Sequence, residues 1–155
     1  MFTPELVGWR TQYERMLRGV ERLKRPYISS TDYLDDLQHF LQDCWHLKDW
    51  IKNDPEIGIG KRIEDEVKAE EALRIVGDLA TACKHLNHDD RDARGNGERA
   101  YATGNDVTSH LGQTRPVDVV LRIKTGDGRV ISDKELIERA TSTWDAVLRR
   151  LALIT

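Results

Sequence analysis

Two short segments place a cysteine two residues before a histidine, and their side chains have the most potential for chemistry. One is Cys44-Trp45-His46-Leu47, inside a helix-patterned run, and the other is Cys83-Lys84-His85-Leu86, at the end of another. Imidazole titrates near neutral pH and suits proton transfer, whereas a thiol reacts or binds metal as the thiolate. Buried groups of this kind need partners or do chemistry. Any functional site is therefore predicted where these two helices meet.

Acid–base chemistry on RNA is one hypothesis for the second segment. Lys84 and His85 end a helix before an arginine-containing loop, so a phosphate could be held beside a titratable imidazole. Asp78 lies seven residues before His85, on the same helix face, where it could orient a water or an imidazole. The candidate catalytic residues are His85, Asp78 and Lys84, and the candidate binding residues are His46, Arg91 and Arg94. The alternative is that His85 caps the last carbonyl groups of its helix.

A zinc site is a second hypothesis. His39 and His46 share a helix face, and His85 and His88 are three residues apart, so four imidazoles from two helices could surround Zn²⁺. The Cys and His within each segment point about 200° apart, however, so neither pair can chelate while the helix continues. We therefore expect no metal and no other cofactor. Both cysteines occupy apolar helix positions, where burial raises the thiol pKa and disfavours nucleophilic catalysis.

Composition indicates one globular domain. The 155 residues are 39% apolar and 33% charged, with 24 basic against 27 acidic side chains and a net charge of −3. No apolar run reaches the length of a membrane span and no leader is recognisable, so we expect a cytoplasmic protein without a membrane partner. Residues 1–30 hold six basic side chains against three glutamates. This first helix presents either a solvated face or a phosphate-binding stripe.

Four helices are predicted from apolar residues at alternating spacings of three and four. The predicted boundaries are Thr3 as N-cap to Pro26, the Ser29–Asp32 cap to Asn53, about Lys61 to Leu86, and the Ser132/Glu135 capping box to Ile154. The second helix has the broadest apolar face and is expected at the centre. The charged first half of the third helix is expected to be exposed or frayed.

The remaining sequence predicts a mobile loop over residues 87–116 and a β-hairpin over about residues 117–131, with a turn at residues 125–128. The predicted fold is therefore a mainly α, single-domain four-helix bundle over residues 1–155, with the hairpin inserted between the third and fourth helices. Four tryptophans are many for such a bundle, and they predict a homodimer. The alternative is that Trp9, Trp45, Trp50 and Trp144 all fill the core.

Residues 43–51 and 78–86 carry a resemblance to known proteins. Their sequences, Asp-Cys-Trp-His-Leu-Lys-Asp-Trp-Ile and Asp-Leu-Ala-Thr-Ala-Cys-Lys-His-Leu, are similar to those of a widespread family of small uncharacterised bacterial proteins. The helix order, with a polar motif closing the third helix, also resembles HEPN domains, which are dimeric helical bundles. Many of them are metal-independent ribonucleases of toxin–antitoxin and antiphage systems, with an Arg four to six residues before a His. Here His85 matches the His, but the nearest upstream arginine is Arg74, eleven residues away.

The resemblance implies a HEPN-like protein that acts through RNA or a protein partner, in phage defence or a toxin–antitoxin context. Because the arginine of the signature is missing, ribonuclease activity is expected to be degenerate or absent. The alternative function is that of a non-enzymatic structural, adaptor or immunity-type interaction protein without nucleic-acid binding. Salt dependence separates the two hypotheses, because phosphate contacts weaken steeply as salt is added.

Overall fold

The computed structural model describes residues 8–84, 99–108 and 116–155, which form five helices and one three-stranded antiparallel sheet. The helices are α1 (Trp9–Leu23), α2 (Ser30–Asn53), α3 (Arg62–Ala69), α4 (Glu71–Lys84) and α5 (Asp133–Arg150). The strands are β1 (Tyr101–Thr108), β2 (Asp118–Lys124) and β3 (Val130–Ser132). The prediction of a mainly helical chain is confirmed, whereas the predicted number of helices is wrong.

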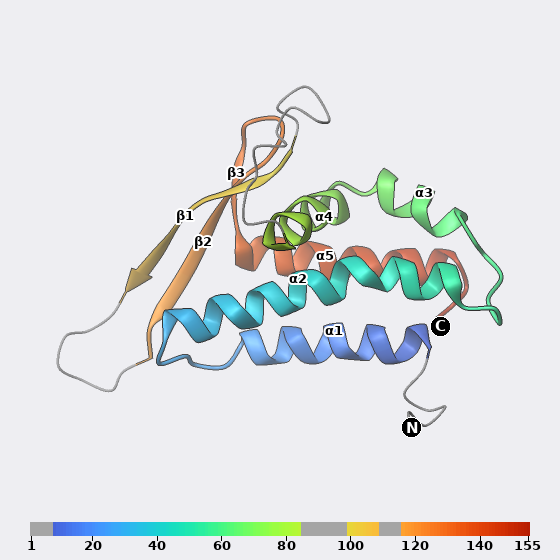
Figure 1. Cartoon of the computed structure of the whole chain (residues 1–155), viewed down its shortest axis with the longest axis horizontal. Coiled ribbons are helices and arrows are strands. Elements are labelled where there is room, and N and C mark those ends of the chain that lie inside the picture. Colours follow the sequence, from blue (N-terminus) through green and yellow to red (C-terminus); the bar gives the residue numbers. More distant parts are fainter. Residues whose placement is uncertain (1–7, 85–98, 109–115) are drawn as a thin grey trace.

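Helix α2 lies at the centre of the helical body, in contact with α1, α3, α4 and β2 (Figure 1). The apolar stripe that its 3-4 spacing predicts is fully buried: Leu37, Phe40, Cys44, Leu47 and Ile51. The side chain of Ser29 accepts a hydrogen bond from the Asp32 N–H, so the predicted cap is confirmed. The expected central position of this helix is confirmed as well.

Helix α1 begins at Trp9, directly after Gly8, whose φ of 133° favours glycine. The predicted helix start at Thr3 is therefore wrong, and Thr3 itself lies outside the described residues. The helix ends at Leu23, three residues before the proline that was expected to stop it. Its buried face, which includes Trp9 and Met16, packs on α2.

The predicted third helix is broken in two at Glu70, which has the extended angles φ −98° and ψ 114°. Val67 and Val76 are nine residues apart, so a continuous helix would point them about 180° apart. The break changes the helical phase, and both side chains are buried, at 2% and 0% exposure. The charged first half is therefore not frayed: it forms α3, which buries Ile63 and Val67.

Arginines from other elements pair with the glutamates on both sides of this break. Arg150 of α5 donates hydrogen bonds to Glu66 at 2.6 Å and to Glu70 at 3.0 Å. Arg139 of α5 donates to Glu71 at 2.8 Å, and this hydrogen bond is the main cause of the lowered pKa of Glu71. The α3–α4 junction is thus held against α5 by side-chain contacts.

The sheet has the order β1-β2-β3 and lies, in sequence, between the fourth and fifth helices. The predicted pairing across the turn at residues 125–128 is present as β2 with β3, which ends at Ser132. The prediction of two strands is wrong, because β1 adds a third strand. A mobile loop is predicted for residues 87–116, and β1 contradicts this for residues 101–108. Its sequence lacks apolar alternation, so the pairing partner makes it a strand.

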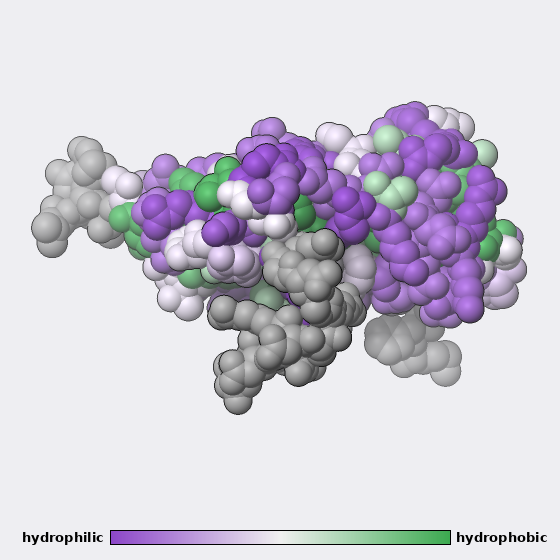
Figure 2. Space-filling model, turned by 90° about the horizontal axis from the view of Figure 1, so that it is seen from above, coloured by the Kyte–Doolittle hydropathy of each residue, from purple (hydrophilic) through white to green (hydrophobic). Residues whose placement is uncertain are grey.

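Strands β1 and β2 form an arm that projects from the helical body (Figure 1). Every β1 residue except Gly104 is exposed, whereas β2 buries Val119 and Ile123. Both ends of the arm are tied to the helices: the Val117 N–H donates to the Tyr27 carbonyl at 2.7 Å, and the Ala100 N–H donates to Asp78 at 3.1 Å. On the face seen from above, the surface of the body is mostly hydrophilic, with apolar residues in separate patches (Figure 2).

Helix α5 closes the body and begins as predicted. The Ser132 side chain accepts a hydrogen bond from the Glu135 N–H at 3.1 Å. The predicted apolar series is buried as far as Val147: Ile137, Ala140, Trp144 and Val147. The helix ends at Arg150, not at the predicted Ile154, and the last two members of the series, Leu151 and Ile154, are half-buried beyond it. Among residues 8–84, 99–108 and 116–155, no helix combines the length and the apolar character that crossing a bilayer requires.

Candidate functional site

Helices α2 and α4 meet, as the predicted site requires, and an indole ring fills their contact. A Cβ added at Gly77 of α4 would lie 2.5 Å from Trp45 Cζ3, so only glycine leaves room for the ring in this position. The Lys48 Nζ lies 4.5 Å from the centroid of the same ring, at cation–π distance. The packing of these two helices is therefore specified by a close glycine–tryptophan contact.

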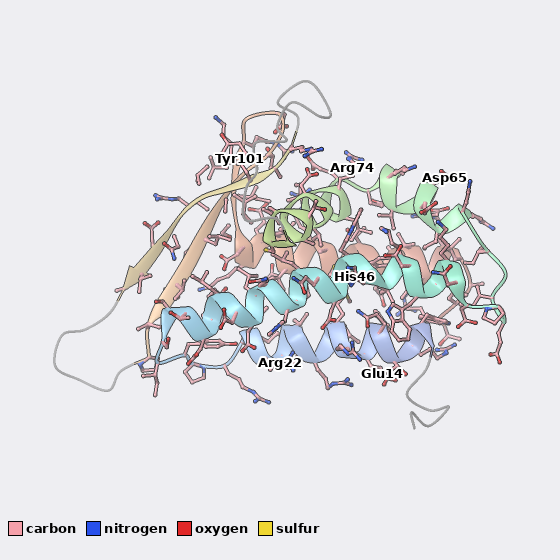
Figure 3. The ribbon with its side chains drawn as sticks, viewed as in Figure 1. Glu14, Arg22, His46, Asp65, Arg74 and Tyr101 are labelled. Carbon is pink, nitrogen blue, oxygen red and sulfur yellow. The ribbon has the colours of Figure 1, made fainter. Side chains whose placement is uncertain are left out.

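The predicted site residues divide between described and undescribed parts of the chain. Asp78 Oδ2 accepts a hydrogen bond from the Ala100 N–H at 3.1 Å, which ties α4 to the start of β1. His46 is half-buried on α2 (Figure 3), and Lys84 is the last residue of α4. The remaining three, His85, Arg91 and Arg94, lie outside the described residues. The catalytic and binding roles of all six residues therefore stay predictions, and the hydrogen bond of Asp78 to Ala100 is a structural contact.

The two cysteines differ in their environment. Cys44 is completely buried, and burial raises the pKa of its thiol to about 12. Cys83 is exposed as a residue, although partial burial of its sulfur also raises its thiol pKa. The prediction that both cysteines are buried apolar residues is thus confirmed for Cys44 and wrong for Cys83. Neither environment favours a thiolate.

One reactive thiol per chain is expected in the native protein. A thiol reagent that absorbs on release, applied at pH 8, should titrate Cys83 and leave Cys44 unmodified, because the reagent cannot reach a buried sulfur. The second equivalent should appear only in guanidinium chloride. The Cys83→Ser variant should show no native reaction. Rapid modification of two thiols in the folded wild type would contradict the burial of Cys44.

A metal centre is not assembled by the described residues. Within them, no three His, Cys, Asp or Glu side chains converge as a ligand set. His39 and His46 both lie on α2, one exposed and one half-buried. The other two imidazoles of the zinc hypothesis, His85 and His88, lie outside the described residues.

A further candidate surface follows α1. Four arginines recur there at spacings of three and four residues: Arg15, Arg18 and Arg22 share one sector of the α1 surface, and Arg25 follows in the turn just after the helix ends. This set is the α1 arginine stripe; Figure 3 labels one member, Arg22, and, further along the same helix, Glu14. Successive members are about 5 Å apart along the axis. All are exposed except the half-buried Arg22.

The stripe keeps most of its positive charge. Arg15 Nη1 lies 4.0 Å from Asp43 Oδ1, and Arg22 Nε lies 3.8 Å from Asp36 Oδ1. These ion pairs are long and only partly buried, so they contribute little to stability and leave the guanidinium groups partly accessible. Arg18 and Arg25 form no ion pair with any residue that the structure describes.

A groove of about 940 Å³ opens at the C-terminal end of the stripe, between α1, the start of α2, the start of β2, and α5. Apolar and aromatic side chains make up much of its lining, including Val20, Leu23, Tyr27, Tyr33, Val117, Val119 and Ile137. Charged side chains also line it: Lys24, Arg25, Asp118, Lys134 and Glu138. Arg25 therefore belongs to both the stripe and the groove.

Hydrogen bonds fix the two tyrosines of the groove. The Tyr33 hydroxyl donates to Asp133, whose other oxygen accepts the Leu121 N–H at 3.2 Å. The Tyr27 hydroxyl donates to Asp36 at 2.7 Å, and its ring meets the Tyr33 ring edge-on, with centroids 5.1 Å apart. Burial and these carboxylates raise the pKa of both phenols. Both tyrosines therefore stay protonated and hold fixed positions in the groove wall, so neither can act as a base.

The arginine stripe can be predicted from the sequence, whereas the groove cannot. An excess of arginine in residues 1–30 is visible directly, whereas the groove lining comes from segments more than a hundred residues apart in the chain. No protein-family model matches the chain, and no curated protein or solved structure matches it either.

Proposed function

We propose that this protein binds RNA through the α1 arginine stripe and does not cleave it. The observation that supports the proposal is the alignment of three arginines along α1 with a fourth just beyond its end; two of the four have no ion pair among the described residues. Guanidinium groups bind phosphate in a planar, bidentate geometry and keep their charge at every physiological pH. A row of them suits a repeating phosphate backbone.

The proposal that RNA is not cleaved rests on the contacts and protonation of the titratable side chains. Asp78 holds the start of β1, Cys44 is buried with a raised pKa, and the groove tyrosines stay protonated. Such an RNA-binding, non-hydrolytic role fits the HEPN resemblance with its missing signature arginine. A role in phage defence or a toxin–antitoxin system belongs to the same proposal.

A second candidate is an adaptor or immunity-type protein that binds another protein, and the projecting arm favours it. Strand β1 is an edge strand, and its Tyr101 and Val107 are 50% and 45% exposed. Edge strands can accept an extended segment of a partner by strand addition. Self-association belongs to this candidate, because Trp45 and Trp50 are only half-buried, whereas Trp9 and Trp144 fill the core.

Filter binding of a labelled single-stranded RNA at two salt concentrations tests the first proposal. If the four arginines each neutralise one phosphate, affinity should fall about 50-fold between about 50 and 200 mM salt. The double variant Arg18→Ala/Arg25→Ala removes two contacts, so its affinity should be lower at low salt. It should then fall only about sevenfold over the same range.

The matched control removes two cations from another helix. Lys61 and Arg62, at the start of α3, are exposed, and their replacement by alanine changes the net charge by the same amount. This variant should keep the salt dependence of the wild type. Equal effects of the two double variants, or no RNA binding by the wild type at low salt, would refute the stripe and leave the protein-binding candidate.

A further inference from the structure

We propose that the groove at the end of α1 holds one unstacked base of the bound RNA, and that it selects a base with an exocyclic amino group. This inference rests on the proposed RNA binding. It adds that the bound RNA is single-stranded and that the protein prefers certain bases. The stripe and the groove are adjacent, because Arg25 is the last member of the stripe and also lines the groove. A phosphate backbone that follows α1 therefore reaches the groove mouth.

The size and lining of the groove suit a nucleobase. Its volume of about 940 Å³ lies within the range of small-molecule sites, which are largely apolar with a few placed polar groups. Val20, Leu23 and Ile137 offer apolar contacts to the faces of a base but none to a phosphate. Tyr27 and Tyr33 are already fixed by their hydrogen bonds, so binding need not order them. A base in a duplex is stacked and paired, so only single-stranded RNA can supply one.

Glu138 provides the proposed base preference. It lies in the groove lining, is exposed, and forms no ion pair with the residues that the structure describes. The other acidic lining residue at the surface, Asp118, already accepts a hydrogen bond from Lys134 at 2.9 Å. A carboxylate accepts hydrogen bonds from an amino group such as cytosine N4, whereas uracil presents a carbonyl oxygen in its place. Cytosine should therefore bind better than uracil.

Fluorescence anisotropy with two labelled ten-nucleotide RNAs, oligo-cytidine and oligo-uridine, tests this inference in about 50 mM salt. The wild type should bind oligo-cytidine about tenfold more tightly, since a good contact to a base edge discriminates by roughly 5- to 150-fold. A ten-base-pair RNA duplex cannot place a base in the groove, so the Glu138→Ala substitution should leave its affinity unchanged. The Glu138→Ala variant should bind both oligonucleotides equally and keep the salt dependence of the wild type.

A groove-filling variant gives a second, independent measurement. Ser142 is exposed and lines the groove, so Ser142→Trp should occupy the space of the base without disturbing the core, and Ser142→Ala is its control. The tryptophan variant should lose the cytidine preference, and the alanine variant should keep it. Salt-dependent binding without any cytidine preference, unchanged in both groove variants, would overturn the base site and leave the stripe intact. Failure of the wild type to bind any RNA would overturn both the stripe and the base site. A groove that takes up an amphipathic peptide instead of a base would overturn the base site alone.

Discussion

Replacing Asp133 with alanine should lower the free energy of unfolding by about 3 to 5 kcal/mol, because a buried and a partly buried hydrogen-bond donor lose their acceptor. Asp133 is 1% exposed, and its carboxylate accepts hydrogen bonds from the Tyr33 hydroxyl and the Leu121 N–H. These donors belong to α2 and β2, and Asp133 begins α5. The Asp133 side chain thus joins α2, β2 and α5, three elements that also line the groove.

Urea denaturation followed by circular dichroism measures this loss. The matched variant Asp133→Asn should lose only about 1 kcal/mol, since its amide oxygen can accept the Leu121 N–H and its amino group can donate to Tyr33. Tyr33→Phe should also cost about 1 kcal/mol, because it removes one hydroxyl and leaves the acceptor partly satisfied. A loss below about 1 kcal/mol in Asp133→Ala would show that the network does not hold the fold together.

Truncating Trp144 to alanine should destabilise the protein by about 3 to 5 kcal/mol through the cavity it leaves. Trp144 is 1% exposed, the largest of the fully buried side chains. Its indole N–H donates to the Cys44 carbonyl at 3.1 Å and so connects α5 to the centre of α2. The truncation therefore removes core volume and leaves a buried carbonyl without this partner.

Two other variants separate volume from hydrogen bonding in the same denaturation experiment. Trp144→Phe keeps most of the apolar volume and loses the N–H, so about 1 to 2 kcal/mol should be lost. Trp50→Ala truncates a half-buried tryptophan and should cost clearly less than Trp144→Ala, because less apolar surface is removed from the core. Similar losses for the two tryptophan truncations would argue against the burial described for α5.

The candidate surfaces differ in how far the sequence alone could predict them. The arginine stripe is local, because positions three and four residues apart share a helix face wherever the helix packs. The groove is not local, since Leu23, Val119 and Ile137 come together only after α1, β2 and α5 have packed. Burial of Cys44 followed from its place in an apolar series, but the exposure of Cys83 did not, because it depends on where α4 leaves its neighbours.

The sequence by itself determined the elements whose signals lie within a few consecutive residues. Helices α2 and α5 have both an apolar period and a capping serine, so Ser29 and Ser132 mark their starts correctly. Only the tertiary structure decided the break at Glu70 and the strand β1. The break lets Ile63 and Val67 reach the same core as Val76, which one continuous helix cannot do. Residues 101–108 have no intrinsic strand pattern, and they become a strand because β2 supplies hydrogen-bond partners from elsewhere in the chain.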